Sequence, residues 1–221
     1  MRLLNTESLA ATLDAVYDAG PSQIARPERL RVAKWIASRQ GLPGSYANMF
    51  APTDRDRKGL RLYTGEKITT RAATAHILGE EACRALVLLN VSDAGVQRAL
   101  AAAQAGIAER LEHAEKIGVQ MGTYCCGPCT VSMWRHLLVG GLGRVEERLA
   151  AGLRQLKKHR LDSGRWRRFP FYYTLTALVE MEHSQDELRY VASACERALQ
   201  RTGGKLEKRR RLLLEKVLAK V

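Results

Sequence analysis

Three of the five cysteines in this 221-residue sequence lie in one short stretch, TYCCGPCTVSMW, between Thr123 and Trp134. Cys126 and Cys129 are separated by two residues, a spacing that suits disulfide formation between the two thiols or shared binding of a metal ion. Pro128 favours the first turn of a helix, and a thiol at a helix N-terminus has a lowered pKa because the helix dipole stabilises the thiolate. We therefore predict a thiol site at Cys126 and Cys129.

The tetrapeptide Cys126-Gly-Pro-Cys129 resembles the active-site motif of the thioredoxins, which implies dithiol exchange. Thioredoxins place a strand before the motif, whereas the preceding segment AERLEHAEKIGVQ has a helical pattern here, so the resemblance covers the tetrapeptide alone. The stretch also resembles the all-helical AhpD-like peroxidase family, which has a His four residues after the second Cys and a Glu upstream. In this sequence Met133 fills the His position, His136 follows three residues later, and Glu115 is off by one.

The sequence leaves three other interpretations of the cysteines open. Gln120 followed by Cys126 resembles a segment of bacteriocin-processing cysteine peptidases, which implies an oxyanion-binding Gln and a nucleophilic Cys. The Cys-x-x-Cys pair is also half of a structural zinc site, and Cys83, Cys195 or a histidine joins it only through tertiary structure. The third interpretation is that small thiol side chains fill tight helix contacts. From the sequence alone we predict neither a metal nor a cofactor.

Aromatic residues form a second group of candidates. In the segment GRWRRFPFYYTLTALVEM, between Gly164 and Met181, the hydrophobic spacing predicts a helix that packs into the core. For Tyr172 and Tyr173 we predict side chains that face a cavity. His76 shares a predicted helical face with Cys83, and Glu80 lies between them, so an acid–base role and simple burial are both open for it.

A degenerate repeat links these aromatic residues. Its units are Gln40-x-x-x-Gly44-x-Tyr46, Gly118-x-x-x-Gly122-x-Tyr124 and Arg160-x-x-x-Gly164-x-Trp166. The pattern resembles the Q-x-x-x-G-x-W repeats of squalene cyclases, terpenoid cyclases and protein prenyltransferases. The resemblance implies an α/α toroid of helical hairpins around a cavity, with ligand-binding residues at Tyr46, Tyr124, Trp166, Tyr172 and Tyr173. The acidic motif of the cyclases and the Asp, Cys and His zinc set of the prenyltransferases do not occur, so their chemistry is not carried over.

The formal net charge of +13 is concentrated in two segments. Residues 154–168 carry seven basic residues against one acidic residue, and residues 201–221 carry eight against two. Such segments bind phosphate backbones, although a solvated helix face has the same composition. The alternative nucleic-acid site comprises Arg165, Arg167, Arg168, Arg209, Arg210 and Arg211.

Hydrophobic residues recur every three or four positions through most of the chain, which predicts an all-α fold without strands. We predict a first helix capped by Asn5 or Thr6, a helix after a cap at Thr70, a long helix beginning at Ser92 or Asp93, and a late helix with a Ser184–Glu187 capping box. No linker divides the sequence. The expected architecture is therefore one helical domain over residues 1–221.

The composition is that of a globular protein, with 46% hydrophobic and 27% charged residues. The beginning of the sequence lacks the apolar run of a signal peptide, and no apolar stretch has the length of a membrane span, so we expect a cytoplasmic protein with reduced thiols. The predicted function is binding of a small-molecule or protein ligand in a concave cavity next to the thiol site. A thiol-disulfide oxidoreductase and a nucleic-acid-binding helical module are the alternatives.

Overall fold

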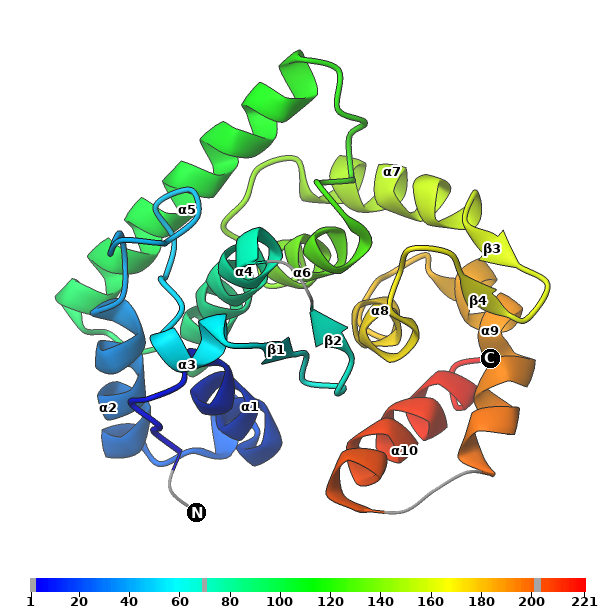
Figure 1. The fold of residues 1–221 in the computed structure, drawn as a ribbon, viewed down its shortest axis with the longest axis horizontal. Coiled ribbons are helices and arrows are strands. Elements are labelled where there is room, and N and C mark those ends of the chain that lie inside the picture. Colours follow the sequence, from blue (N-terminus) through cyan, green and yellow to red (C-terminus); the bar gives the residue numbers. More distant parts are fainter. Residues whose placement is uncertain (1–2, 69–70, 201–203) are drawn as a thin grey trace.

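The computed structural model describes residues 3–68, 71–200 and 204–221, and these residues form mainly α-helices (Figure 1). In chain order the helices are α1 (Leu9–Ala19), α2 (Arg26–Ala37), α3 (Asp54–Arg57), α4 (Arg71–Leu89), α5 (Ala94–Lys116), α6 (Gly127–Leu137), α7 (Val145–Lys157), α8 (Phe171–Leu178), α9 (Gln185–Leu199) and α10 (Gly204–Leu218). A 3-10 turn, η1 (Pro21–Gln23), follows α1. The predicted all-α fold class is confirmed.

The prediction that strands are absent is wrong in one respect, because two small antiparallel hairpins occur. β1 (Leu60–Arg61) pairs with β2 (Lys67–Ile68), and β3 (Arg160–Leu161) pairs with β4 (Arg165–Trp166). Each strand has only two residues, which is too short for an alternating hydrophobic pattern to be visible in the sequence.

The inner helices α4 and α6 pack against each other at the centre of the fold, and α8 packs beside α6 (Figure 1). Helices α2, α5, α7 and α9 lie toward the outside, so the chain passes alternately through inner and outer helices from α4 to α9. The predicted buried face of α4 is confirmed, since Leu78, Ala82, Leu86 and Leu89 are all buried. Helix α4 thereby forms the wall on which two polar clusters are built.

The N-termini of α1 and α5 follow the expected capping chemistry with one correction. Asp93 caps α5 by accepting hydrogen bonds from the amides of Gly95 and Val96, as predicted. Helix α1 is capped by Ser8 rather than by Asn5 or Thr6, because the Ser8 hydroxyl accepts a hydrogen bond from the Ala11 amide. The predicted cap at Thr70 lies outside the described residues.

The predicted capping box of α9 is wrong. The Ser184 hydroxyl donates instead to the carbonyls of Leu178 and Met181, at the end of α8. Glu187 accepts hydrogen bonds from Arg160 and from the indole of Trp166. Both side chains are recruited by tertiary partners, which the local spacing of a capping box does not reveal.

The three repeat glycines, Gly44, Gly122 and Gly164, all have φ between 74° and 85°, which favours glycine. The three units nevertheless differ in the structure that comes after the turn. Gly164 lies in the turn of the β3–β4 hairpin, so a hairpin separates α7 from α8 in the third unit. The turn at Gly164 is therefore not a simple connection between two helices.

Close backbone packing fixes the loop that precedes α6. A β-carbon on Gly127 would lie 2.0 Å from the carbonyl oxygen of Arg168, and one on Gly122 would lie 2.3 Å from that of Arg148. The buried indole of Trp134 donates a 2.8 Å hydrogen bond to the Gly122 carbonyl. The backbone of the Arg168 segment and that of α7 thus both pack closely against the region where α6 starts.

In the part of the chain that is described, no helix is long and apolar enough to cross a membrane.

Candidate functional site

The N-terminus of α6 positions Cys126 and Cys129. Cys126 is the N-cap residue in extended conformation, and Pro128 lies in the first turn, as the sequence predicts. Cys126 is exposed, whereas Cys129, nearly one helical turn further on, is completely buried. One thiol of the pair is therefore open to solvent and the other is shielded beneath it.

The three sulfur atoms of this stretch interact with one another. Hydrogen bonds from the thiols of Cys125 and Cys129, together with the Cys129 backbone amide, lower the pKa of Cys126. The hydrogen bond with Cys126 raises the pKa of Cys125, and hydrogen bonds with Cys125 and Cys126, together with burial, raise the pKa of Cys129. Negative charge in the cluster is consequently favoured on the exposed sulfur, Cys126.

His76 reaches this cluster from α4. Its Nδ1 atom lies 3.7 Å from Cys125 Sγ, and the imidazole is buried. The ring stacks on Tyr46 with ring centroids 4.6 Å apart and meets the edge of Tyr124 at 4.5 Å. The two tyrosine hydroxyls hydrogen-bond to each other. Two of the predicted ligand-binding aromatics thus hold the histidine ring beside the thiols.

Behind His76, a buried carboxylate joins two histidines. Glu80 Oε2 lies 2.5 Å from His136 Nδ1, and Glu80 Oε1 lies 3.4 Å from His76 Nε2. The first contact is a strong hydrogen bond, whereas the second is a close contact without hydrogen-bond alignment. Burial alone would raise the pKa of Glu80, but the two histidines outweigh it and lower the pKa to about 2. His136 is connected further to the side chain of Gln104 at 3.3 Å.

The sequence does not predict most of this arrangement. The shared helical face associates His76 with Cys83, yet Cys83 is buried on α4 and is not part of the cluster around His76 Nδ1. Glu115, the upstream acid suggested by the AhpD-like pattern, pairs with Arg148 instead. Glu80 supplies the carboxylate. The one feature of the sequence that could have indicated the role of Glu80 is its spacing of four residues from His76, which places both side chains on one helix face.

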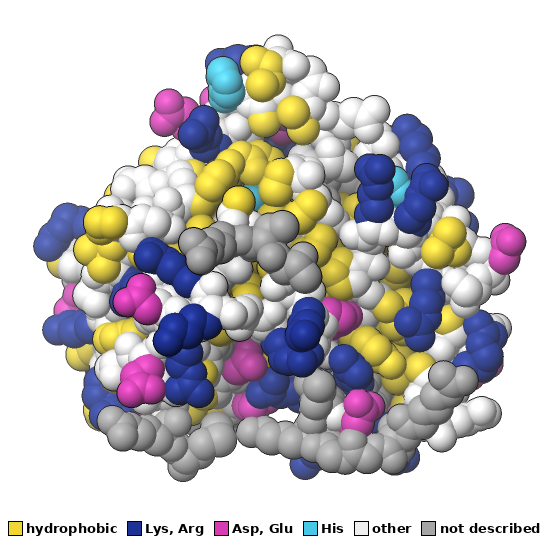
Figure 2. All heavy atoms as spheres, in the orientation of Figure 1, with side chains coloured by type: hydrophobic (Ala, Val, Ile, Leu, Met, Phe, Trp, Pro, Cys, Tyr) yellow, Lys and Arg dark blue, Asp and Glu magenta, His cyan; other side chains and the backbone are white. Residues whose placement is uncertain are grey.

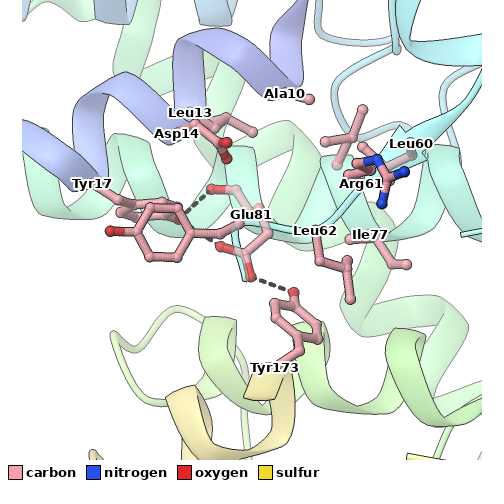
Figure 3. A pocket seen from close by; sticks show the side chains of 12 residues that line it. Ala10, Leu13, Asp14, Tyr17, Leu60, Arg61, Leu62, Ile77, Glu81 and Tyr173 are labelled. Atoms are coloured by element: carbon pink, nitrogen blue, oxygen red, sulfur yellow. Dashed lines mark hydrogen bonds between the residues drawn. The ribbon is translucent and has the colours of Figure 1, made fainter. Parts of the chain in front are cut away.

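The other predicted aromatic residues are not brought to the thiol site. Trp166 is buried and donates its indole N–H to Glu187. Tyr172 packs under the guanidinium of Arg210 at 4.4 Å. Tyr173 is buried and donates its hydroxyl hydrogen to Glu81 (Figure 3). Each of these three side chains thus has its own partners away from the thiol cluster.

A second polar cluster surrounds Glu81, which comes from the same helix as Glu80. Its carboxylate accepts hydrogen bonds from Tyr17 at 2.6 Å and from Tyr173 at 2.5 Å (Figure 3). It also accepts a 2.6 Å hydrogen bond from Arg135 Nε. Burial raises the pKa of Glu81, but the Arg135 guanidinium reverses this effect and lowers the pKa below its ordinary value. Glu81 is therefore an ionised, fully bonded buried carboxylate.

A cavity of about 540 Å³ opens beside this cluster, between α10 and helices α1, α4, α6 and α8. Its basic lining residues are Arg84, Arg135, Lys208, Arg209 and Lys216, and its acidic ones are Asp18 and Glu180. Arg84 donates a 2.7 Å hydrogen bond to Glu180 at the cavity wall. Positive charge predominates, and the volume suits a small molecule.

Several residues of the predicted nucleic-acid site have partners within the chain. Arg209 pairs with Asp14 and Asp18, and Arg211 pairs with Glu215. Arg210 contacts Glu207, and Arg165 lies over the ring of Phe171. Arg167 and Arg168 are exposed. Figure 2 shows Lys and Arg side chains scattered among acidic and hydrophobic ones on the face in view, without a continuous basic patch there.

Three side chains of the thiol cluster place possible metal-ligand atoms close together. His76 Nδ1, Cys125 Sγ and Cys129 Sγ all lie within 4.8 Å of one another. Sulfur and imidazole donors of this kind suit thiophilic metals, and thiols at this spacing also suit disulfide chemistry. Compared with protein-family models, with curated proteins and with solved structures, the chain matches none of them. The function must therefore be argued from the geometry.

Proposed function

We propose that the protein carries out thiol–disulfide exchange, with Cys126 as the attacking thiol and Cys129 as the resolving thiol. The observation that carries this proposal is their placement on α6, with Cys126 exposed at the N-cap and Cys129 buried one turn later. An attacking thiol must meet a substrate disulfide, and a resolving thiol must be kept from doing so. The two positions meet these separate requirements.

The reaction has two steps. The Cys126 thiolate attacks one sulfur of a substrate disulfide, forms a mixed disulfide and releases the other substrate sulfur as a thiolate. The Cys129 thiolate then attacks Cys126 Sγ, closing the Cys126–Cys129 disulfide and releasing the second substrate thiolate. The substrate gains the two electrons that the cysteines lose, and the two thiol protons end on the released sulfurs. A second dithiol restores the reduced pair by the reverse steps.

The test is trapping of the mixed disulfide. Metal-free Cys129→Ser protein, incubated with oxidised glutathione, is expected to accumulate one glutathione on Cys126, located by peptide mass spectrometry. The unmodified sequence is expected to give the Cys126–Cys129 disulfide, and Cys126→Ser neither product. Cys195→Ser, which removes a buried thiol of α9, is the matched control. An adduct shared evenly among all exposed cysteines, or no intramolecular disulfide, would rule the exchange out.

Ligand binding in the basic cavity is a second candidate function. The excess of basic over acidic residues in the cavity lining favours this function and indicates that the ligand is a small anion. Pyrophosphate is expected to raise the melting temperature, and replacing the exposed Lys208 and Lys216 by alanine is expected to abolish that rise. Lys58→Ala, an exposed change elsewhere, is the control. An identical rise in all three proteins would indicate a nonspecific salt effect.

As part of the same proposal, the protein has an α/α-toroid-like arrangement around this cavity. The alternation of inner and outer helices from α4 to α9 supports it.

Nucleic-acid binding through residues 154–168 and 201–221 stays a prediction. Because each neutralised phosphate releases counterions, binding would have to weaken steeply with salt. The in-chain partners of Arg209 and Arg211 leave less free charge for such binding than the sequence suggests.

A further inference from the structure

We propose that His76, Cys125 and Cys129 bind one zinc-like, thiophilic divalent ion in the reduced protein. The site goes beyond the proposed exchange reaction, since it involves two residues, His76 and Cys125, that have no part in the exchange steps. Its three donor atoms come from α4, from the loop before α6 and from α6 itself.

The spacing of the donors fits this ion. A tetrahedral zinc site has Zn–S bonds of about 2.3 Å and Zn–N bonds of about 2.1 Å, which separates neighbouring donor atoms by roughly 3.5 to 3.8 Å. Cys125 Sγ and His76 Nδ1 are 3.7 Å apart, and all three donor atoms lie within 4.8 Å of one another. Small side-chain adjustments therefore suffice to close the site around an ion.

The imidazole of His76 is oriented as a metal ligand requires. Nδ1 faces the sulfurs, while Nε2 faces Glu80 Oε1 at 3.4 Å. A carboxylate behind a histidine favours the tautomer with the proton on the carboxylate side, which leaves the opposite nitrogen free to bind a metal. Glu80 is itself held by the 2.5 Å hydrogen bond with His136. Stacking on Tyr46 and contact with Tyr124 fix the plane of the ring.

The ion has a route to the site and a further donor at its outer side. Cys125 and Cys126 are exposed, so the cluster is open to solvent on the side opposite Glu80. Two thiolates and one imidazole form a donor set that suits Zn²⁺ and disfavours Mg²⁺ or Ca²⁺, which prefer oxygen. A water molecule or the Cys126 sulfur would complete the fourth coordination position of the ion.

Metal binding and exchange compete for one atom, Cys129 Sγ. A Cys126–Cys129 disulfide removes that sulfur from the donor set, and a bound ion keeps the resolving thiol occupied. This consequence rests on the proposed exchange reaction, whereas the metal site does not. Loading with zinc is accordingly expected to slow the reaction with oxidised glutathione, and oxidation is expected to release the metal.

The test titrates Co²⁺ into the reduced, metal-free full chain and follows the thiolate-to-cobalt charge-transfer absorption. We expect saturation at one ion per chain and displacement by Zn²⁺. Cys125→Ser, a change at an exposed position, is expected to weaken Co²⁺ binding at least tenfold and to reduce the charge-transfer band. Because His76 is buried, its replacement by Ala is checked for folding by circular dichroism. The exposed His113→Ala and the buried Cys195→Ser are the controls.

Two further variants separate this proposal from the exchange reaction. Cys125→Ser is expected to lose the metal and to keep the Cys126–Cys129 disulfide, and Cys126→Ser is expected to do the opposite. A wild-type chain without a saturable cobalt band, or a band unchanged in Cys125→Ser, overturns the metal site. Loss of the band in Cys126→Ser with retention in Cys125→Ser also overturns it, because the donors would then be different.

Discussion

His76 directs its Nδ1 atom at Cys125 across 3.7 Å, although the two residues are 49 positions apart in the sequence. The contact exists because α4 and α6 pack against each other and because the loop before α6 is held in place at Gly122 and Gly127. It gives the cysteine stretch a basic nitrogen that the tetrapeptide motif does not contain.

Glu80→Gln tests the role of the carboxylate behind His76. The amide keeps the volume of the side chain but no longer favours a proton on His76 Nε2 through a negative charge. We expect roughly 10- to 100-fold weaker Co²⁺ binding, the usual effect of losing such a partner. The measurement is competition with a chelator of known affinity, and Glu112→Gln on the exposed side of α5 is the control. Equal affinities in the two variants would show that Glu80 has no part in metal binding.

Thiol labelling tests the exposure difference on α6. In metal-free reduced protein, Cys126 and Cys125 are expected to react with a maleimide in a fast phase, because both are exposed, whereas Cys83, Cys129 and Cys195 are buried. Mass spectrometry at short times should show two labelled cysteines. Cys126→Ser should lose one label and keep the other. Fast labelling of Cys129 would mean that the start of α6 opens readily, and the division into attacking and resolving thiols would then fail.

The sequence predicts well those features that depend on neighbours along the chain. The buried face of α4, the Asp93 cap and the start of α6 at the cysteines all follow from local spacing and are confirmed. Ser184 and Glu187 show the limit, since their local pattern is that of a capping box and tertiary partners override it.

Tertiary contacts that local spacing does not reveal matter even more in the candidate site. Cys126 and Cys129 are visible in the sequence because their spacing is short. His76, Glu80 and His136 join them only through the packing of α4 against α6, and one sequence contains no measure of that packing. A His–Glu spacing of four residues is common on helices and does not by itself point to cysteines elsewhere.

Glu81 and Arg135 provide a stability test inside the fold. Glu81→Gln removes the nearer charged partner of the buried Arg135, at 2.6 Å, and leaves only the partly exposed Glu180 at 3.8 Å, so we expect the free energy of unfolding to fall by about 3 to 5 kcal/mol. Urea denaturation measures this change. The double variant Glu81→Gln with Arg135→Met should lose less than the sum of the single changes, since no buried charge is then left unpaired. Additive losses would show that the pair is not coupled.

Asp56 offers a second stability test, at the N-terminus of α1. Its buried carboxylate accepts hydrogen bonds from the Ser8 hydroxyl at 2.6 Å, the Leu9 amide at 2.9 Å and the Thr53 amide at 2.9 Å. Asp56→Ala leaves these donors unsatisfied, and we expect a loss of about 2 to 4 kcal/mol on urea denaturation. Asp54→Ala, at an exposed position two residues earlier, should change stability by less than about 1 kcal/mol. Similar losses in both variants would place the effect in α3 rather than in the anchoring of α1.

Asp14 should make stability depend on pH between about 4 and 6. Burial raises its pKa from 3.8 to about 6, against the opposing effect of Arg209, while the nearby charges of Asp18 and Glu81 raise it further. Because the folded pKa is the higher one, the folded state binds a proton in this range that the unfolded state has lost. Stability contributed by Asp14 is therefore complete below about pH 4 and falls as pH rises toward 6.

A third of the Asp14 side chain is exposed, so solvent screening reduces the size of this effect to about 1 to 2 kcal/mol. Urea denaturation of the wild-type protein and of Asp14→Asn at several pH values isolates it, because every other titrating group is common to the two chains. The difference in unfolding free energy between wild type and Asp14→Asn should fall by that amount from pH 4 to pH 7. Asp54→Asn, a change at an exposed carboxylate, should leave the corresponding difference flat. Parallel curves for wild type and Asp14→Asn would show that Arg209 holds Asp14 ionised in spite of its burial.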